Sequence, residues 1–216
     1  LNPDDLPLVG GFMDGTVVKT GIPGSGPIEP GEDAERNPFW KELNLAFYSF
    51  AKSTCGLRYV SIVLADGTTV YCSACFSARC NDSRVVLETG VDLALELLQP
   101  EEPRVGVYAD TAFARTPFVH KKHRAATNEQ LMEGLCFNQC RTSVEHSYSY
   151  ARKKCKILRN WFSMSLKKKN SQLYLPMALF LCNLFNCVSD NQTAKYYKCK
   201  PYSVEEYLSL LDEPVR

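Results

Sequence analysis

Three acidic residues lie in three different sequence settings. Asp14 and Asp110 end short apolar runs, and Glu145 stands inside a long basic pattern with helical spacing. The apolar runs predict strands, and the basic pattern predicts a helix. Carboxylates from two strands and one helix can supply the hard oxygen ligands that a pair of Mg²⁺ or Mn²⁺ ions needs. We therefore interpret the three acids as a metal-binding triad for phosphoryl transfer, the chemistry of nucleases and strand-transfer enzymes.

Each acid also has a simpler interpretation. Asp14 opens an Asp-Gly-Thr sequence that is typical of a turn at a strand end. Asp110 fits a loop acid or a helix N-cap, and Glu145 fits an exposed helical charge paired with Arg141 or Arg152. Taken singly, these interpretations explain the residues as well as a metal site does. Taken together, the three settings favour the metal site.

Other candidate sites are weaker. Asn81 and Asp82 stand where they would cap a following helix, so we treat Asp82 as a second-tier site residue. His146 adjoins Glu145 and is a second-tier candidate for proton transfer, with a surface histidine as the simpler alternative. A zinc site at Cys72 and Cys75 would need a second pair of cysteines, but Cys136 and Cys140 have the wrong spacing. The sequence contains neither a nucleophile elbow around a serine nor a phosphate-binding P-loop.

Length and composition predict one domain. The chain has 216 residues, of which 45% are hydrophobic, and we expect a single core over residues 1–216. It does not open with a basic segment followed by an apolar stretch, and the longest apolar run, residues 173–188, contains Pro176 and two asparagines. These features argue against secretion and membrane insertion. The ten cysteines are therefore expected to be reduced thiols.

The charge is divided unevenly along the chain. The formal net charge is +1, yet residues 1–110 carry 8 Lys and Arg against 16 Asp and Glu, and residues 111–216 carry 17 against 8. Residues 115–169 alone carry 13 basic and 3 acidic side chains. Such a surface is typical of phosphate binding, although a single lysine on a solvated helix face needs no partner. Together with the three acids, it favours nucleic acid as the partner.

The first half of the chain predicts the strands that would position the aspartates. Residues 8–18 predict a strand with Asp14 near its end. Residues 57–65 and 68–75 flank an Asp-Gly pair and predict a hairpin. Residues 83–98 then follow helical spacing, and residues 104–108 predict a short buried strand that leads to Asp110.

The second half of the chain is expected to be mainly helical. Residues 115–124 predict a basic loop, residues 128 to about 160 a helix that contains Glu145, and residues 171–187 another helix. The predicted fold class is α/β, with strands, a helix, another strand and then helices in chain order. No internal repeat is visible.

Four motifs carry a family resemblance. They are Gly11-Phe-Met-Asp-Gly-Thr, Ala78-Arg-Cys-Asn-Asp-Ser-Arg-Val, Tyr108-Ala-Asp-Thr-Ala-Phe, and the pattern Arg141-x3-Glu-x2-Tyr-x3-Arg-x-Lys-x2-Ile-Leu. They resemble the catalytic domain of DDE transposases of the PIF/Harbinger type. The resemblance covers nearly the whole chain, and the 35 positions from Asp110 to Glu145 are typical of the wider group.

The sequence also departs from the family pattern at three places. Ser149 and Cys155 replace a usual glycine and a usual aromatic residue, and Ala78-Arg79 replaces a usual Gly-Ser pair. None of these changes removes an expected metal ligand, but they leave a repurposed copy open as an interpretation.

The resemblance implies a ribonuclease H-like mixed sheet flanked by helices, and an endonuclease and strand-transfer activity. It implies that Asp14 bridges two Mg²⁺ or Mn²⁺ ions, that Asp110 holds one of them and that Glu145 holds the other. DNA phosphates flanking the cut would meet a set of basic residues, namely Lys121, Lys122, Arg124, Arg141, Arg152, Lys153 and Lys154.

The resemblance also implies a nuclear location, a Myb-like DNA-binding partner protein and a homo-oligomer as one assembly. The helix-turn-helix region that usually precedes such domains is not expected within this chain. The alternative function is a domesticated DNA-binding or protein-interaction module with little or no cleavage. The three intact acids favour the enzyme, because clustered carboxylates repel one another without a metal ion.

Overall fold

The computed structural model describes most of the chain. The described residues are 9–21, 42, 45–98, 105–113, 116, 118–121, 127–159, 170–189 and 191–212. Within them, the strands form one seven-stranded sheet with the central order β2-β3-β1-β6-β7, and β4 and β5 both pair with β3. Their bounds are β1 Val9–Lys19, β2 Tyr48–Ser49, β3 Thr54–Val63, β4 Thr69–Cys72, β5 Phe76–Ser77, β6 Gly106–Ala109 and β7 Val119–Lys121.

The sheet is mixed. Strand β1 runs antiparallel to β3 on one side and parallel to β6 on the other, and β6 runs parallel to β7. The predicted hairpin joins β3 to β4: the Leu64 N–H donates to the Thr68 carbonyl at 2.9 Å, and Gly67 adopts a φ of 90° that favours glycine. The Asp66 carboxylate accepts a hydrogen bond from the Thr68 N–H at 2.8 Å, so the turn is closed by its own residues.

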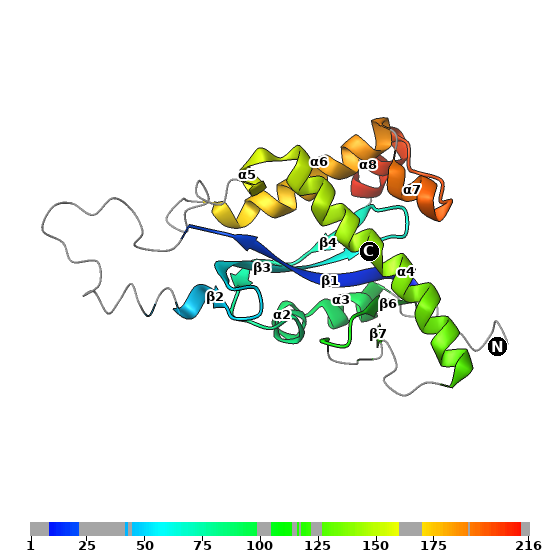
Figure 1. The fold of residues 1–216 in the computed structure, drawn as a ribbon. Coiled ribbons are helices and arrows are strands. Elements are labelled where there is room, and N and C mark those ends of the chain that lie inside the picture. Colours follow the sequence, from blue (N-terminus) through cyan, green and yellow to red (C-terminus); the bar gives the residue numbers. More distant parts are fainter. Residues whose placement is uncertain are drawn as a thin grey trace, which may run out of the picture.

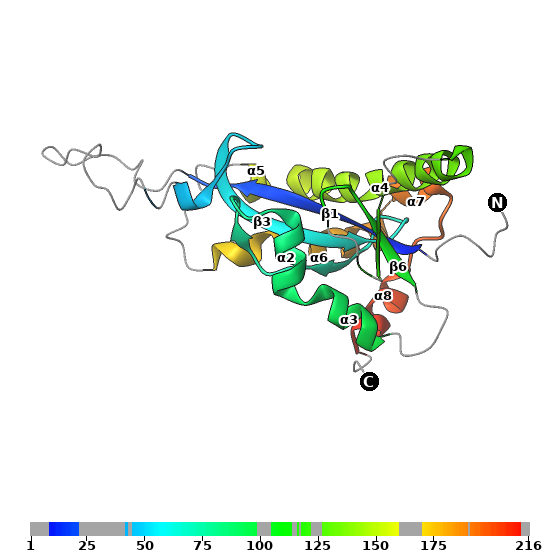
Figure 2. The ribbon, with the colours of Figure 1, turned by 90° about the horizontal axis from the view of Figure 1, so that it is seen from below.

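Helices cover both faces of the sheet (Figures 1 and 2). Helices α4, α5 and α6 lie on one face, and α2 and α3 lie on the other. The helical bounds are α2 Asp82–Thr89, α3 Val91–Leu98, α4 Asn128–Lys154, α5 Lys156–Arg159, η4 Ser171–Leu173, α6 Tyr174–Val188, α7 Gln192–Tyr197 and α8 Val204–Asp212. This α/β arrangement of a mixed sheet flanked by helices confirms the predicted fold class and is compatible with a ribonuclease H-like fold.

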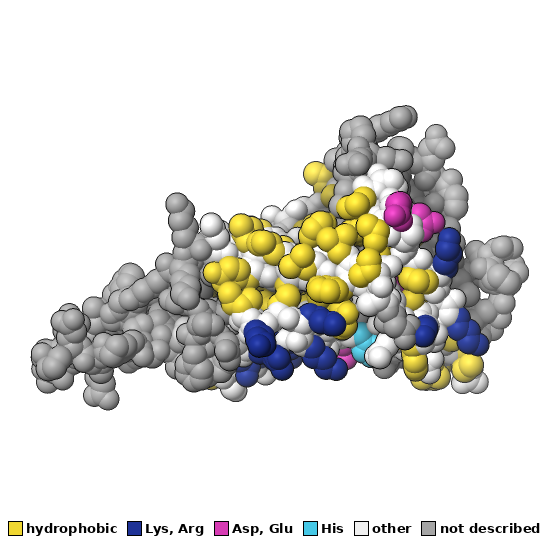
Figure 3. Space-filling view, turned by 90° about the horizontal axis from the view of Figure 1, so that it is seen from above, with side chains coloured by type: hydrophobic (Ala, Val, Ile, Leu, Met, Phe, Trp, Pro, Cys, Tyr) yellow, Lys and Arg dark blue, Asp and Glu magenta, His cyan; other side chains and the backbone are white. Residues whose placement is uncertain are grey.

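The outer surface of the helical layer is not uniform. Figure 3 shows hydrophobic side chains gathered in the middle of that side and Lys and Arg side chains along one border. Several large apolar side chains of α6 are exposed, including Met177, Phe180 and Phe185. No helix in the described parts of the chain is both long enough and apolar enough to cross a membrane.

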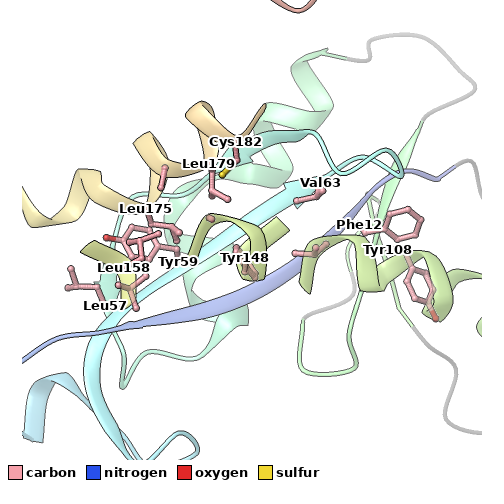
Figure 4. Packing of buried hydrophobic residues seen from close by; sticks show 14 residues of the cluster. Phe12, Leu57, Tyr59, Val63, Tyr108, Tyr148, Leu158, Leu175, Leu179 and Cys182 are labelled. Atoms are coloured by element: carbon pink, nitrogen blue, oxygen red, sulfur yellow. The ribbon is translucent and has the colours of Figure 1, made fainter. Parts of the chain in front are cut away.

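Alternation along β1 divides the core into two clusters. Phe12 and Val18 pack in the cluster beneath α4 and α6, whereas Met13 packs with α2 and α3 on the other face. The same alternation along β6 places Tyr108 beside Phe12, as Figure 4 shows. Tyr148 of α4 is buried in the same cluster. Side chains at even positions of β1 therefore face α4.

The first strand agrees with its predicted bounds within one residue, but Asp14 does not lie near its end. Strand β1 continues to Lys19 and pairs with β3 as far as Gly56, so Asp14 lies in the middle of the strand and not near its end. The prediction of a turn at Asp14 is therefore wrong. Val17 and Val18 maintain the strand because both are buried against their neighbours. A partly buried aspartate in mid-strand needs an explanation, because strands are depleted in aspartate.

Several other elements also differ. The helix expected over residues 83–98 is two helices, because Gly90 ends the first with a φ of 63°. Strand β7 occupies part of the expected basic loop, and α4 ends at Lys154, followed by the short α5. The ten cysteines all lie within described residues, and none of them forms a disulfide, as the sequence predicted.

Candidate active site

Asp14 is held in place by its strand and by α4. Its side chain is 20% exposed and faces α4. The buried Tyr148 hydroxyl donates to the Asp14 carbonyl oxygen at 2.8 Å, and the Gly15 N–H donates to Asp14 Oδ1 at 2.8 Å. Burial raises the pKa of Tyr148 well above its ordinary value, so the hydroxyl stays protonated and able to donate. Asp14 therefore has a fixed backbone and one carboxylate oxygen directed towards α4.

Asp110 follows the adjacent parallel strand. The register pairs Phe12 with Tyr108 and Met13 with Ala109. Continued by one residue, it places Asp110 beside Asp14. Its side chain is exposed, and Oδ1 accepts hydrogen bonds from the Thr111 N–H at 2.7 Å and from Thr111 Oγ1 at 3.4 Å. Asp110 therefore forms the local hydrogen bonds expected of a loop acid.

Glu145 reaches the site from α4. Arg141, Glu145, Tyr148 and Arg152 are spaced by four, three and four positions, which keeps them on one face of a helix. The Arg141 Nη2 lies 3.3 Å from Glu145 Oε1, and the same guanidinium donates through Nη1 to Asp14 Oδ2 at 3.0 Å. The expected ion pair between Arg141 and Glu145 is thus confirmed, and Asp14 is its third member.

The electrostatics of this cluster are those of crowded negative charge. Burial raises the pKa of Asp14 above its ordinary value of 3.8, and the Gly15 N–H and the Arg141 guanidinium oppose that rise. The charges of Asp82 and Glu145 raise the pKa further. Added positive charge at this point would therefore favour the ionised form of Asp14.

A cavity of about 520 Å³ opens beside these carboxylates. Asp14 and Glu145 line it together with basic side chains from three elements, Lys19, Lys52 and Arg152. Arg152 Nη2 donates to Thr16 Oγ1 at 3.1 Å and to the Val17 carbonyl at 3.3 Å, which ties α4 to β1 beyond Asp14. The basic side chains of the cavity can therefore accept a negatively charged group, and its carboxylates can bind cations.

A family comparison decides what kind of domain this is. The family model described as DDE superfamily endonuclease matches residues 13–186, a span that contains Asp14, Asp110 and Glu145. The chain belongs to this family. No curated protein and no solved structure matches the chain.

Membership supports a transposase or nuclease function for this DDE endonuclease domain, and the family generally uses divalent metal ions. The PIF/Harbinger type stays a prediction. Within the described residues, no group of three His, Cys, Asp or Glu side chains is placed to hold a metal ion. The donor chemistry nevertheless fits: Arg141 already places a cationic group between two carboxylates, and the Asp110 carboxylate, the third oxygen donor, turns towards Thr111.

Asp82 lies on the opposite face of the sheet from Arg141. It is the first residue of α2, and the N-cap is Asn81, whose side chain accepts from the Arg84 N–H. Capping by Asn81 is therefore confirmed, whereas the capping role predicted for Asp82 is wrong. Asp82 instead forms an ion pair with Arg58 at 2.5 Å. A Cβ atom on Gly15 would lie 2.0 Å from Asp82 Oδ1. Asp82 therefore packs directly against the backbone of β1 next to Asp14.

The sequence did not predict a role for Arg58, nor the close packing that requires a glycine at position 15, although Gly15 lies within the first motif. Arg58 is a charged residue in the largely buried strand β3, and a buried charge requires a partner. That requirement is visible in the sequence, but it does not identify Asp82 as the partner. The need for a glycine at position 15 depends on the approach of α2 and has no local signal.

The expected DNA-binding residues divide into three groups. Lys121 ends β7, and its Nζ donates to the Phe113 carbonyl at 3.3 Å, whereas Lys122 and Arg124 lie outside the described residues. Arg141 and Arg152 border the carboxylates, as described above. The third group, Lys153 and Lys154, lines a second cavity together with His146.

Proposed function

We propose that this DDE endonuclease domain is a metal-dependent DNA endonuclease and transposase catalytic domain that hydrolyses phosphodiesters and transfers strands. Asp14, Asp110 and Glu145 are its proposed catalytic and metal-binding residues. The observation that carries the proposal is the Arg141 guanidinium, which contacts Asp14 at 3.0 Å and Glu145 at 3.3 Å. Two carboxylates from separate elements already share one cation at this position.

The proposed metal ligands are carboxylates on three separately anchored elements: β1, the residue after β6, and α4. Anchoring matters because carboxylates that bind divalent ions must be held in position before the ions arrive. Bound there, two Mg²⁺ or Mn²⁺ ions would activate a water molecule or a 3′-hydroxyl as nucleophile and stabilise the leaving oxygen. Rotation of the Asp110 side chain away from Thr111 would complete the set of ligands.

The chain's own residues have distinct proposed tasks. Tyr148 and the Gly15 N–H fix Asp14, as their hydrogen bonds indicate. Arg141, displaced from the carboxylates when cations bind, would contact a phosphate oxygen next to the cut. Arg152 would orient the DNA strand along β1. His146, which is exposed beside Glu145, would take part in proton transfer.

The partners proposed for the domain follow from its substrate. DNA phosphates would meet Lys121, Lys122, Arg124, Arg152, Lys153 and Lys154, because these residues belong to the basic half of the chain. We also propose a nuclear location, a Myb-like partner and assembly as a homo-oligomer, for which the family resemblance is the only support.

The experiment that tests the proposal is cleavage of supercoiled plasmid with Mg²⁺ or Mn²⁺, comparing the wild type with Asp110→Ala, Glu145→Ala and Glu88→Ala. Glu88 is a matched control, because it forms an i,i+4 pair with Arg84 at 3.3 Å and is 50% exposed, against 3.3 Å and 54% for Glu145. We expect the wild type and Glu88→Ala to nick DNA and the other two variants to lose at least about a hundredfold in rate, since even outer-shell residues are worth up to that factor.

Equal activity of Glu88→Ala and Glu145→Ala would contradict the proposed triad. A wild type that binds DNA without nicking it in either metal would favour the domesticated binding module instead.

A further inference from the structure

A second cavity has a volume of about 610 Å³. Ser149 of α4 lines both cavities, so they adjoin along one helix. The walls of the second cavity come from α4, α6, α7 and the turn at Gly67. We call it the α4–α7 groove. Its volume is within the range of ligand-binding clefts in proteins.

Well-packed contacts fix the α7 wall of the groove. Asn191 is buried, donates to the Asp66 carbonyl at 3.0 Å and accepts from the Ala194 N–H at 3.0 Å, which attaches α7 to the β3–β4 turn. The Tyr197 hydroxyl donates to the Gln139 carbonyl at 2.6 Å and also contacts Thr142, which attaches the other end of α7 to α4. The groove is thus formed by fixed elements and not by a loop.

The chemistry of the lining is basic and aromatic. Lys153, Lys154 and His146 contribute the titratable nitrogen groups, and among the described residues that line the groove there is no aspartate or glutamate. The remaining lining is mainly hydroxyl and amide side chains, with Tyr150 and Tyr196 as the aromatic rings. Figure 3 shows Lys and Arg side chains gathered along a border of the helical side of the molecule. An anionic ligand with polar edges fits such a lining.

Tyr196 gives this ligand a more specific character. Its side chain is 71% exposed, although it sits against Tyr197 in an edge-to-face pair with ring centroids 4.9 Å apart. Lys154 also has a set position, because its Nζ lies 5.3 Å from the centroids of both Tyr150 and Phe185. A held, exposed ring beside lysines is the combination with which proteins bind single-stranded nucleic acid, where bases stack on rings and phosphates meet cations.

We infer that the α4–α7 groove binds one DNA strand with unpaired bases, at the stretch that continues from the phosphodiester held at Asp14 and Glu145. The inference rests on the proposed function for its choice of DNA. Glu145 and Lys153 are eight residues apart on α4, about 12 Å along the helix axis, so one strand can contact both regions. A paired base presents only its edge to a ring on the protein surface, so Tyr196 favours an unpaired strand.

The test is fluorescence anisotropy with a labelled 20-nucleotide DNA strand and with the same sequence as a duplex, in EDTA so that no cleavage occurs. Tyr196→Ala is compared with Tyr196→Phe, which keeps the ring, and with Phe50→Ala. Phe50 is a matched control outside the groove lining: it is 70% exposed and forms an edge-to-face pair with Tyr48 at 5.2 Å. We expect Tyr196→Ala to weaken single-strand binding about tenfold, in line with the loss of one stacked base.

Tyr196→Phe and Phe50→Ala are expected to bind the single strand as the wild type does, and duplex binding should change less than single-strand binding in Tyr196→Ala. Lys153→Gln should lower the slope of log affinity against log salt by about 0.7, the value for one phosphate contact in a single strand. Lys156→Gln, an exposed lysine on α5 that does not line the groove, should leave that slope unchanged.

Tyr196→Ala binding that equals Phe50→Ala binding would overturn the inference, and so would equal loss for strand and duplex. An RNA strand of the same sequence that binds more tightly and depends on Tyr196 would overturn the choice of DNA. Because binding is measured without metal, a negative plasmid assay leaves this result intact. The two experiments therefore distinguish a failure of this inference from a failure of the proposed function.

Discussion

The two faces of β1 each carry an arginine–carboxylate cluster, and the two clusters differ in how far their charges are matched. On the α2 face, Arg58 and Asp82 form a one-to-one pair at 2.5 Å, with side chains 11% and 18% exposed. On the α4 face, Arg141 serves both Asp14 and Glu145, and the Glu145 side chain is 54% exposed. The first cluster is closed and balanced, whereas the second has an excess of negative charge and access to solvent.

The difference indicates that the pair of Arg58 and Asp82 is structural, whereas the cluster around Arg141 can exchange its guanidinium for another cation. A mostly buried pair with matched charges has no place for another ion, because its charges are already neutralised. A cluster with two carboxylates for one guanidinium, open to a cavity, can accept further positive charge. Perturbed groups of this kind concentrate at functional sites, although structural ion pairs produce them too.

The largest expected effect concerns the closed pair. Asp82→Ala leaves Arg58 mostly buried without its carboxylate, and we expect the free energy of unfolding to fall by about 3 kcal/mol, the lower end of the range for breaking a buried pair. Urea unfolding followed by circular dichroism measures it. Glu88→Ala, which breaks an exposed pair, should stay within about 0.5 kcal/mol of the wild type. Equal stability of the two variants would remove the distinction between a closed pair and a surface pair.

The sequence already contained the elements that local chemistry specifies. The hairpin at Asp66-Gly67 was predictable because the turn uses its own residues, and α4 was predictable from its spacing. Strand β7 was not, since its three residues form a strand only by pairing with β6. The break at Gly90 was overlooked because the apolar spacing continues across it.

The candidate site shows the same division. The pairing of Arg141 with Glu145 follows from helical spacing, so it could be predicted from the sequence. The contact of Arg141 with Asp14 joins residues 127 positions apart and depends on how α4 crosses the sheet. Asp82 was assigned to helix capping because the sequence does not show that Arg58, 24 positions away, lies opposite it.

The next effect separates the two arginines by their response to metal. In EDTA, Arg141→Gln should lose about 1 kcal/mol of stability, because the ion pairs it breaks are partly exposed. Mn²⁺ at about a hundredfold excess over its dissociation constant for the wild type should add about 2.7 kcal/mol to the wild type, as binding to the folded state alone requires. It should add about 1 kcal/mol more to Arg141→Gln, which has no guanidinium for the cations to displace, so that the deficit of this variant closes. Thermal and urea unfolding with and without MnCl₂ measure both values.

Arg58→Gln is the comparison for this prediction. Mn²⁺ should stabilise this variant by the same amount as the wild type, because the proposed metal ligands are unchanged, and its deficit relative to the wild type should therefore persist. Asp82 is closed against β1 and offers no space for an ion that could replace Arg58. A deficit that closes in Mn²⁺ for Arg58→Gln, or one that persists for Arg141→Gln, would reverse the assignment of the two clusters.

The smallest expected effect is a pH dependence. The pKa of Asp14 is raised in the folded protein, so its protonated form favours folding: its contribution is fully present below pH 3.8 and is lost as the pH rises through the raised folded value. In EDTA, Asp14→Asn should therefore flatten the fall in melting temperature above pH 3.8. Melting curves collected at a series of pH values above 3.8 test this prediction. If melting temperature falls equally with pH in Asp14→Asn and the wild type, Asp14 does not cause the fall.

The most direct test of the central claim is calorimetric titration of the folded domain with Mn²⁺, comparing the wild type with Asp110→Ala, Glu145→Ala and the control Glu88→Ala. We predict that the wild type and Glu88→Ala bind Mn²⁺ equally, and that the other two variants lose at least about tenfold in affinity. Absence of binding by the wild type, or equal binding by all four proteins, would contradict the assignment of Asp14, Asp110 and Glu145 as a metal site.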